Sequence, residues 1–496
     1  MGRHIFFIFF SLMTLLPPAR GGKTYFAYTV RARDAYSSVL RLRLDEASGR
    51  LDRLKLVEPD NMIVYHIEDY VDFFRLFITE DKALFKRLEA NKKRRLRHIR
   101  SGDPNSPYYL YAQAEINLHW ALLRIKAGQY LSAFNEVSEA YRLLKENERK
   151  FPGFMGNKKS LGILHAVVGA VPDKYRWGVK LIGNMDGSIR QGRREIEEVL
   201  AYAQIHRDFI FKEETEILYA FMLLYLTNQK DQAWQVISGS TLDPADNPLA
   251  CFVQANIALH AGRSAEAERI LNLAPHGDGF FELPYLYFMK GLTKLYRLDA
   301  RAEADFKTFL RLQHGQSYVK EAYQKLAWNA LVHGDLAGYH TYMARCKTEG
   351  TRDQEGDDAA YKDAISGQTP DIRLLQARML FDGGYYKRAH GLLAQFKQSD
   401  FPQEYQLEFL YRSARLSQKL GHDTEAILRY LDVLHFQDKT GSYYPCNAAL
   451  QIGLIYEKNG NKAQARRFFK RVLKMNPRQY KTSLHAKAKA GLNRLG

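Results

Sequence analysis

The sequence predicts an all-α fold in which antiparallel helix pairs stack side by side as a solenoid. Apolar residues recur with the 3.6-residue period of helices over most of the chain. Turn residues return every 34 to 39 residues over two stretches, and most are followed five positions later by a small residue. A length of 496 residues exceeds what one compact core usually holds. A stacked array accommodates it, because each repeat packs only on its neighbours.

The first 21 residues have the features of an export signal. Arg3 precedes an apolar run from Ile5 to Leu16, and the small residues Ala19 and Gly21 occupy the −3 and −1 positions of a cleavage site after Gly21. An uncleaved membrane anchor is the alternative, but this run is too short to cross about 30 Å of hydrocarbon as a helix. We therefore predict a signal peptide over residues 1–21 and an exported protein, periplasmic in a Gram-negative bacterium and otherwise secreted.

The composition is that of a folded and basic protein. Apolar residues make up 46% of the chain and charged residues 26%, so a core can form. The formal net charge of +18 attracts polyanions. Because export is predicted, we expect contact with an anionic envelope surface rather than with nucleic acid. Apolar stretches beyond the signal are too short to span a bilayer, so we expect no transmembrane segment in the mature chain.

Residues 22–107 are expected to form an N-terminal helical region. Ile63, Ile67, Tyr70 and Phe74 fall at i, i+4, i+7 and i+11, which places them on one helix face. A basic run follows, which comprises Lys92, Lys93, Arg94, Arg95, Arg97, His98 and Arg100. Such a run is either the solvated face of a helix, which we favour, or a contact for phosphate or another polyanion.

The clearest repeat lies close to the C-terminus. Its pattern consists of Ala449, Ile452, Gly453, Tyr456, Gly460, Ala465, Phe469 and Pro477. Gly453 and Ala465 are placed where two antiparallel helices approach most closely, since a larger side chain would push the helices apart. Gly460 lies in the turn, where a left-handed backbone costs little only for glycine, and Pro477 ends the second helix. The pattern resembles the tetratricopeptide repeat, and this resemblance implies a solenoid of helix pairs that serves as a binding scaffold.

Weaker copies of the pattern recur upstream. Each pairs a turn residue with a small residue five positions later: Gly421 with Ala426, Gly384 with Ala389, Gly262 with Ala267, Asn228 with Ala233, and Gly128 with Ala133. Two further copies are degraded, with Asp299 before Ala304 and Gly334 before Tyr339. We therefore place a first helical-repeat block at residues 108–346, and C-terminal tetratricopeptide repeats with a capping helix at residues 371–496.

Two segments interrupt the array. Residues 347–370 are polar and acidic and contain glycine, which indicates an acidic loop between the blocks. Residues 151–200 are predicted to be an irregular helical insertion of short helices, punctuated by Gly162, Gly169, Pro172, Tyr175, Trp177, Gly183, Gly187 and Gly192. This insertion resembles the block before the repeats in a family of long tetratricopeptide-repeat proteins, whose yeast member is associated with inclusion-body clearance. That resemblance implies adaptor or scaffold work.

The repeat resemblance also implies a partner-binding groove. In the family, positions 2, 5, 9 and 12 of each first helix line the concave face of the superhelix. Counted from the small residue as position 8, the groove candidates are Trp328, Asp371, Arg378, Phe381, Glu408, Tyr411, Arg415, Gln418, Asn447 and Glu457. Arginine and large aromatic residues dominate binding hot spots, and the two arginines suit a peptide carboxylate or an acidic side chain. The alternative is that these residues only cover the surface between repeats.

No catalytic signature accompanies the repeats. The sequence contains no HExxH, GxSxG, phosphate-loop or CxxC motif, and Cys251, Cys346 and Cys446 are far apart. We therefore predict no catalytic residue, cofactor or metal, and no enzyme activity. The expected function is an exported, non-catalytic scaffold or adaptor that binds a protein or peptide partner in the groove. The alternative is an envelope enzyme or ligand-binding protein for an anionic polymer, with its site in residues 151–200.

Overall fold

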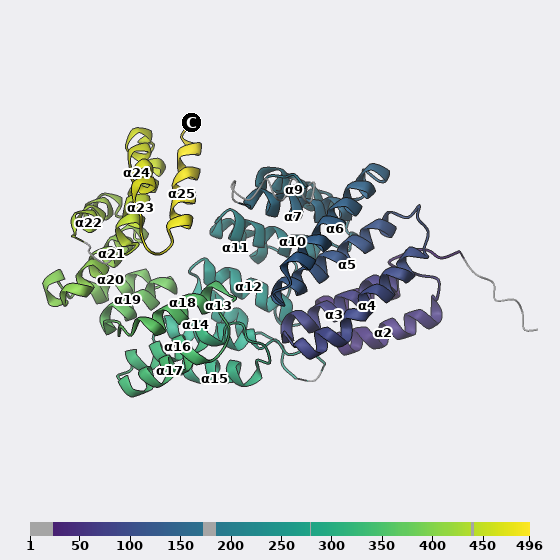
Figure 1. The fold of residues 1–496 in the computed structure, drawn as a ribbon, viewed down its shortest axis with the longest axis horizontal. Coiled ribbons are helices and arrows are strands. Elements are labelled where there is room, and N and C mark those ends of the chain that lie inside the picture. Colours follow the sequence, from purple (N-terminus) through teal and green to yellow (C-terminus); the bar gives the residue numbers. More distant parts are fainter. Residues whose placement is uncertain (1–22, 172–184, 278, 438–440) are drawn as a thin grey trace, which may run out of the picture.

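The structure is helical along the part of the chain that it describes. The computed structural model describes residues 23–171, 185–277, 279–437 and 441–496 (Figure 1). Within these ranges the only β contact is an isolated bridge between Tyr25 and Asn61. The predicted all-α fold is confirmed. No helix in these ranges has the length and apolar character that crossing a membrane requires.

An N-terminal bundle of helices comes first. Its members are α1 (Val30–Leu40), α2 (Leu44–Val57), α3 (Ile63–Thr79), α4 (Lys82–Arg100), α5 (Pro107–Lys126), α6 (Tyr130–Lys150), α7 (Met155–Ala170), α9 (Ile189–Ile205) and α10 (Lys212–Phe221), followed by the π-helical turn η1 (Met222–Leu226). Polar side chains cap the N-termini of several of these helices. The Asp81 carboxylate accepts hydrogen bonds from the backbone N–H groups of Ala83 (2.7 Å) and Leu84 (3.0 Å), and Ser106 caps α5 in the same way.

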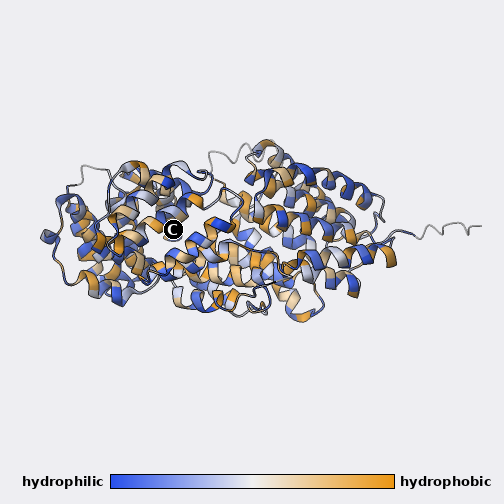
Figure 2. Ribbon diagram, turned by 90° about the horizontal axis from the view of Figure 1, so that it is seen from below, coloured by the Kyte–Doolittle hydropathy of each residue, from blue (hydrophilic) through white to orange (hydrophobic). Residues whose placement is uncertain are grey.

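The repeat array follows the bundle. Its members are α11 (Lys230–Ser238), α12 (Pro248–His260), α13 (Ser264–Leu271), α14 (Tyr285–Tyr296), α15 (Ala302–Leu312), α16 (Val319–Val332), α17 (Leu336–Thr348), α18 (Glu355–Ser366), α19 (Ile372–Asp382), α20 (Tyr386–Leu393), η2 (Gln398–Asp400), α21 (Gln403–Lys419), α22 (Asp423–His435), α23 (Tyr444–Lys458), α24 (Lys462–Lys474) and α25 (Lys481–Arg494). Figure 2 shows hydrophobic and hydrophilic residues alternating along these helices, as stacked amphipathic pairs require.

The turns and helix crossings follow the repeat pattern. The predicted turn glycines all have a positive φ: Gly128, Gly262, Gly334, Gly384, Gly421 and Gly460. The partner alanine Ala465 is fully buried. At Gly453, an added Cβ would lie 2.7 Å from the ring of Phe469, so this glycine provides the space for the ring. The capping helix α25 uses Gly491 against the other side of the same ring, where a Cβ would lie 2.5 Å away.

The structure corrects the expectation of short helices in residues 151–200. Two long helices, α7 and α9, cross there at glycines instead of turning at them. A Cβ on Gly192 would lie 2.1 Å from the carbonyl oxygen of Gly162, and a Cβ on Gly187 would lie 2.6 Å from the Cα of His165. Gly162 and Gly192 therefore permit a close crossing within the two helices, and Gly187 lies against α7 just before α9 begins. Pro172, Tyr175, Trp177 and Gly183 lie outside the described residues.

The prediction of a loop across residues 347–370 is wrong for its second half, which forms α18. Asp357 is fully buried, and its carboxylate accepts hydrogen bonds from the backbone N–H groups of Tyr318 (2.6 Å) and Glu321 (2.9 Å) at the start of α16. Acidic residues in the first turn of α18 are favoured by the helix dipole. The acidic composition thus marks a helix start, not an extended loop.

Two turns of the array meet across a long sequence distance. The backbone N–H of Ser264 donates to the carbonyl oxygen of Gly383 (3.3 Å). A Cβ on Gly384 would lie 1.8 Å from the carbonyl oxygen of Gly262, so the two backbones touch where neither residue carries a side chain. This contact joins the α12–α13 turn to the α19–α20 turn. The array therefore curves back on itself, with α25 turned towards α11 (Figure 1).

Candidate functional site

The structure brings five predicted groove residues into one stack of arginines and aromatic rings. The Cζ atom of Arg378 lies 4.5 Å from the ring centroid of Trp328. The Cζ atom of Arg415 lies 4.3 Å from the centroid of Phe381 and 6.0 Å from that of Tyr411. These five residues come from α16, α19 and α21. Stacking holds a guanidinium by its face and leaves its N–H edge available to an acceptor.

The two arginines of this stack lack strong acidic partners. Arg378 has one carboxylate nearby, that of Asp382, at 3.8 Å, and both side chains are about 40% exposed. Among the described residues, no carboxylate lies within ion-pair distance of Arg415. By contrast, Arg412 on the same helix donates from Nε to Glu408 (2.6 Å). Arg378 and Arg415 can therefore accept a carboxylate or another oxyanion from a ligand, because paired N–H donors are the preferred partners of such groups.

Other predicted groove residues serve the fold instead of facing a ligand. The Asp371 carboxylate caps α19 by accepting from the backbone N–H of Arg373 (2.9 Å). Glu457 accepts two 2.7 Å hydrogen bonds from Arg494. Trp328 and Tyr411 are each 2% exposed, so they support the arginines from behind. The periodicity placed these residues on the correct helices, but it could not tell which side chains were already engaged.

Two amides among the predicted residues also act within the protein. The Nδ2 of Asn447 donates to the hydroxyl of Tyr411 (2.6 Å). The Oε1 of Gln418 accepts from the hydroxyl of Tyr430 (2.6 Å). These bonds fix the orientation of Tyr411 and Tyr430 beneath Arg415. Asn447 and Gln418 are therefore positioning residues for the stack.

A cluster of tyrosines beside the stack was missed by the sequence argument. The ring of Tyr411 lies 4.7 Å from Tyr444 and 6.0 Å from Tyr443, and Tyr443 lies 4.9 Å from Tyr480. Tyr443 is the N-cap of α23 and Tyr480 the N-cap of α25. Tyr443 and Tyr444 precede Asn447, the first position counted in their repeat, so they fall outside the count.

Lysines from distant helices add positive charge to the same region. The pKa of Lys230 on α11 lies below its ordinary value, because partial desolvation penalises the ammonium and because Lys419, Arg415 and Lys487 repel its charge. The Nζ of Lys419 lies 5.6 Å from the ring of Tyr386. The sequence does not indicate that Lys230 and Lys487 are close in space, since only the curvature of the array brings α11 and α25 together. We call Lys230, Arg415, Lys419 and Lys487 the basic cluster.

A second group of titratable residues is buried in the N-terminal bundle. The Nζ of Lys159 lies 3.0 Å from a Glu115 oxygen and 2.9 Å from a Glu214 oxygen. Tyr36 donates to Glu214 (2.9 Å) and Ser160 donates to Glu115 (2.6 Å). The Lys159 side chain is 1% exposed and that of Glu115 is 5% exposed. These groups converge as catalytic groups do, but Lys159 and Glu115 are buried, and Glu214 is the more exposed member at 18%.

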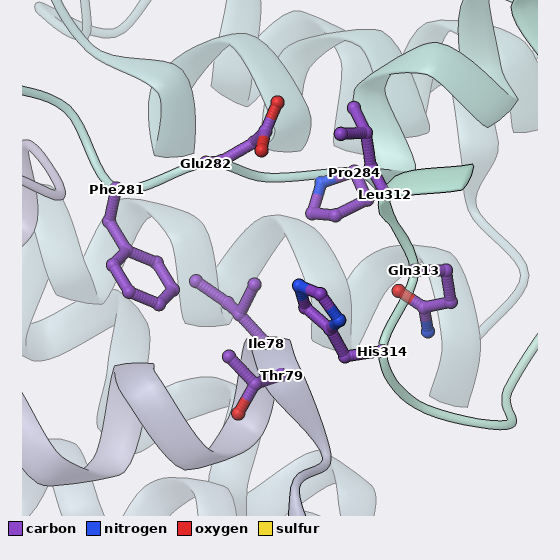
Figure 3. A pocket seen from close by; sticks show the side chains of 8 residues that line it. All are labelled: Ile78, Thr79, Phe281, Glu282, Pro284, Leu312, Gln313 and His314. Carbon is purple, nitrogen blue, oxygen red and sulfur yellow. The ribbon is translucent and has the colours of Figure 1, made fainter. Parts of the chain in front are cut away.

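A small pocket lies between the end of α3 and the connections on either side of α14 and α15. It has a volume of about 270 Å³ and is lined by Ile78, Thr79, Phe281, Glu282, Pro284, Leu312, Gln313 and His314 (Figure 3). Figure 3 shows the Glu282 carboxylate directed away from the His314 ring, so the two do not form an acid–base pair. Within the described ranges, no three His, Cys, Asp or Glu side chains gather as a metal site requires.

Comparison with known proteins supports the repeat assignment. Residues 447–479 match the family model of the tetratricopeptide repeat. These residues form a tetratricopeptide repeat. This repeat contains two of the predicted groove residues, Asn447 and Glu457. No curated protein matches the chain at a significant level.

Several solved structures resemble the tetratricopeptide-repeat fold of this chain. The TPR domain of P58(IPK) is 16% identical, with 83% of this chain and 97% of that chain covered and a TM-score of 0.21. Yeast Tom70 is 12% identical, with coverages of 93% and 96% and a TM-score of 0.23. A monomeric mutant of IFIT1 with Gppp-AAAA is 13% identical, with coverages of 79% and 86% and a TM-score of 0.30. The resemblance of residues 151–200 to the family of the yeast inclusion-body protein stays a prediction.

Proposed function

We propose that this protein is an exported, non-catalytic scaffold that binds an acidic segment of a protein or peptide partner in the groove of its repeat array. One observation carries the proposal. Arg378 and Arg415 are each stacked on an aromatic ring, while their N–H edges lack a close carboxylate among the described residues. A side chain arranged in this way is oriented before the ligand arrives, so little conformational entropy is lost on binding.

The surroundings of the two arginines favour a negatively charged ligand. The basic cluster provides four positive groups, whereas the acidic groups that act on Lys230 and Lys419 are Asp382 and Asp231. A region in which one sign of charge predominates attracts oppositely charged partners and speeds their association. The tyrosines beside the stack supply rigid contact area of the kind that is common in binding hot spots. An acidic peptide segment meets both requirements.

The alternative of an enzyme acting on an anionic polymer through residues 151–200 gains no specific support. Lys159 and Ser160 of that segment do belong to a convergent polar cluster, but both are buried, at 1% and 4% exposed. A substrate needs access to the groups that act on it. The groove is the better candidate, since its arginines are accessible.

Affinity capture from an envelope extract tests the groove. We expect the double variant Arg378→Glu/Arg415→Glu to recover about 30-fold less partner than the wild type, since the charge of two proposed hot-spot residues is reversed. The matched control is Arg467→Glu/Arg471→Glu on α24, where both side chains are exposed and no ion pair is lost. Equal recovery by the wild type and the groove variant would contradict the proposal.

Export is tested separately by the mass of the protein recovered from a secreting host. Removal of residues 1–21 is expected. A mature protein that keeps these residues would contradict the assignment of a cleaved signal.

A further inference from the structure

Helix α4 carries an unusual concentration of basic side chains. Its 19 residues contain one acidic residue, Glu89, and the basic residues Lys82, Lys86, Arg87, Lys92, Lys93, Arg94, Arg95, Arg97 and Arg100. Glu89 is already engaged, because it accepts a 2.8 Å hydrogen bond from Arg124 on α5. The helix therefore has a large surplus of positive charge that its own residues do not balance.

The fold divides these basic residues into two sets. Lys92 and Arg95 point into the bundle, where Lys92 lies 2.6 Å from a Glu136 oxygen and Arg95 lies 2.8 Å from an Asp72 oxygen. Both are buried, together with Leu96 and Ile99. Two members of the basic run therefore have a structural role, which the sequence interpretation of a solvated face did not include.

Six of the seven remaining basic residues form a stripe on the outer face of α4, and the seventh, Arg100, donates from Nε to the Oε1 of Gln113 (3.0 Å). We call Lys82, Lys86, Arg87, Lys93, Arg94 and Arg97 the α4 stripe. All six are exposed, and among the described residues none has a carboxylate within ion-pair distance. At about 100° per residue they fall within an arc of about 140° on the helix, and the helix is about 28 Å long. The stripe is thus a straight band of unpaired cations that covers one side of a rigid helix.

The first described residues of the chain lie beside the C-terminal end of α4. Thr24 donates from its hydroxyl to the carbonyl oxygen of Ser101 (3.0 Å), the residue that follows α4. Lys23 lies 3.9 Å from a carboxylate oxygen of Asp103. The chain therefore enters the described structure at the C-terminal end of the stripe. The Lys23 side chain is 85% exposed, so it adds a positive charge at this end of the stripe.

We propose that the α4 stripe binds the headgroups of a membrane surface rich in anionic lipid, with α4 lying parallel to the membrane. Rows of lysine and arginine at a membrane surface are attracted to anionic headgroups. A straight stripe with no pocket suits a plane of many equivalent charges better than one bound anion. The proposal is independent of the groove, because the stripe lies on the N-terminal bundle and the partner site on the repeat array.

Vesicle co-sedimentation tests the stripe with the full chain. The vesicles contain phosphatidylcholine with about one third phosphatidylglycerol, or phosphatidylcholine alone. We expect Lys82→Glu/Lys86→Glu/Lys93→Glu to weaken binding to the anionic vesicles by about 100-fold, since each basic residue near such a surface contributes about fivefold. Wild-type binding should also fall as the ionic strength rises from about 0.1 M to about 0.5 M.

The matched control reverses the same number of charges on another basic helix. Lys462→Glu/Lys470→Glu/Lys474→Glu on α24 also changes three exposed lysines that have no ion pair among the described residues. It should bind the anionic vesicles within a few fold of the wild type. Equal losses for the two triple variants would overturn the proposal, because net charge alone would then explain binding. Equal wild-type binding to both kinds of vesicle would also overturn it.

Two measurements separate this proposal from folding defects and from the groove. The α4 variant should keep the wild-type melting temperature, since the three lysines contact no buried group. It should also keep its capture of partners, whereas Arg378→Glu/Arg415→Glu should keep vesicle binding. Loss of vesicle binding in the groove variant but not in the α4 variant would assign the membrane contact to the array and refute the stripe.

Discussion

The N-terminal bundle and the repeat array are both helical and both have apolar cores, but the bundle adds a network of buried ion pairs that joins its helices. In the array, helices cross at alanine and glycine, and aromatic rings such as Phe469 fill the space beside each crossing. In the bundle, a buried ion-pair network connects the helices, with Lys159 between Glu115 and Glu214. A second pair joins Arg95 to Asp72. Both regions therefore depend on close packing, at Gly162 and Gly192 in the bundle as at Gly453 in the array, and the bundle depends in addition on the pairing of buried charges.

This difference explains what each region tolerates. A buried ion pair adds little net stability over apolar packing, but removal of one partner leaves an unpaired charge in a medium of low polarity. Close packing responds to volume instead, so an enlarged side chain is the damaging change. The comparison can be tested by one substitution of each kind.

The largest effect is expected for Lys159→Met in the bundle. Removal of the ammonium leaves the Glu115 and Glu214 carboxylates without their cation, at a cost of about 3 to 5 kcal/mol in the free energy of unfolding. Urea denaturation followed by circular dichroism measures it. The neighbouring Lys158 provides the control, because its 2.7 Å pair with Glu198 is partly exposed. Lys158→Met should cost less than about 1 kcal/mol, and equal costs for both variants would contradict a charge-dependent core.

A smaller loss is expected for Ala465→Trp in the array. Ala465 is fully buried at a helix crossing, so the larger ring would overpack the crossing and cost about 1 to 3 kcal/mol. Thermal melting provides the measurement. Ala463→Trp on the exposed side of α24 should leave the melting temperature nearly unchanged. An unchanged melting temperature for Ala465→Trp would show that the crossing is not closely packed.

The smallest effect is expected for Asp371→Ala, which also tests the revised role of a predicted groove residue. Loss of the α19 cap should cost about 1 kcal/mol. Partner capture should be unchanged, because the carboxylate faces the backbone of α19 and not a ligand. Asp371→Asn, which retains a capping oxygen, should keep most of the stability. A strong loss of partner capture in Asp371→Ala would show that Asp371 contacts the partner, as the sequence predicts.

The same contrast governs how much could be predicted from the sequence. Small residues at helix crossings recur at fixed spacing, so the repeats, the turns and the stack of Arg378 and Arg415 were accessible to periodicity. Lys159 and Glu115 could not be recognised, because a charged residue in a helix is usually exposed and its partner lies far away in sequence. Lys230 could not be assigned to the groove either, since its position depends on the curvature of the whole array.

The contact between Gly262 and Gly384 has a consequence for how this protein can change in evolution. An open solenoid can gain or lose a helix pair at any point, because each unit touches only its neighbours. Here the α12–α13 turn and the α19–α20 turn are joined by backbone contact, so the helices between them form a loop of fixed length. One added helix pair would move Gly384 away from Gly262. It would also separate α11, which carries Lys230, from α21, which carries Lys419. The number of units in this segment is therefore fixed by the contact, and variation in length is expected only outside it.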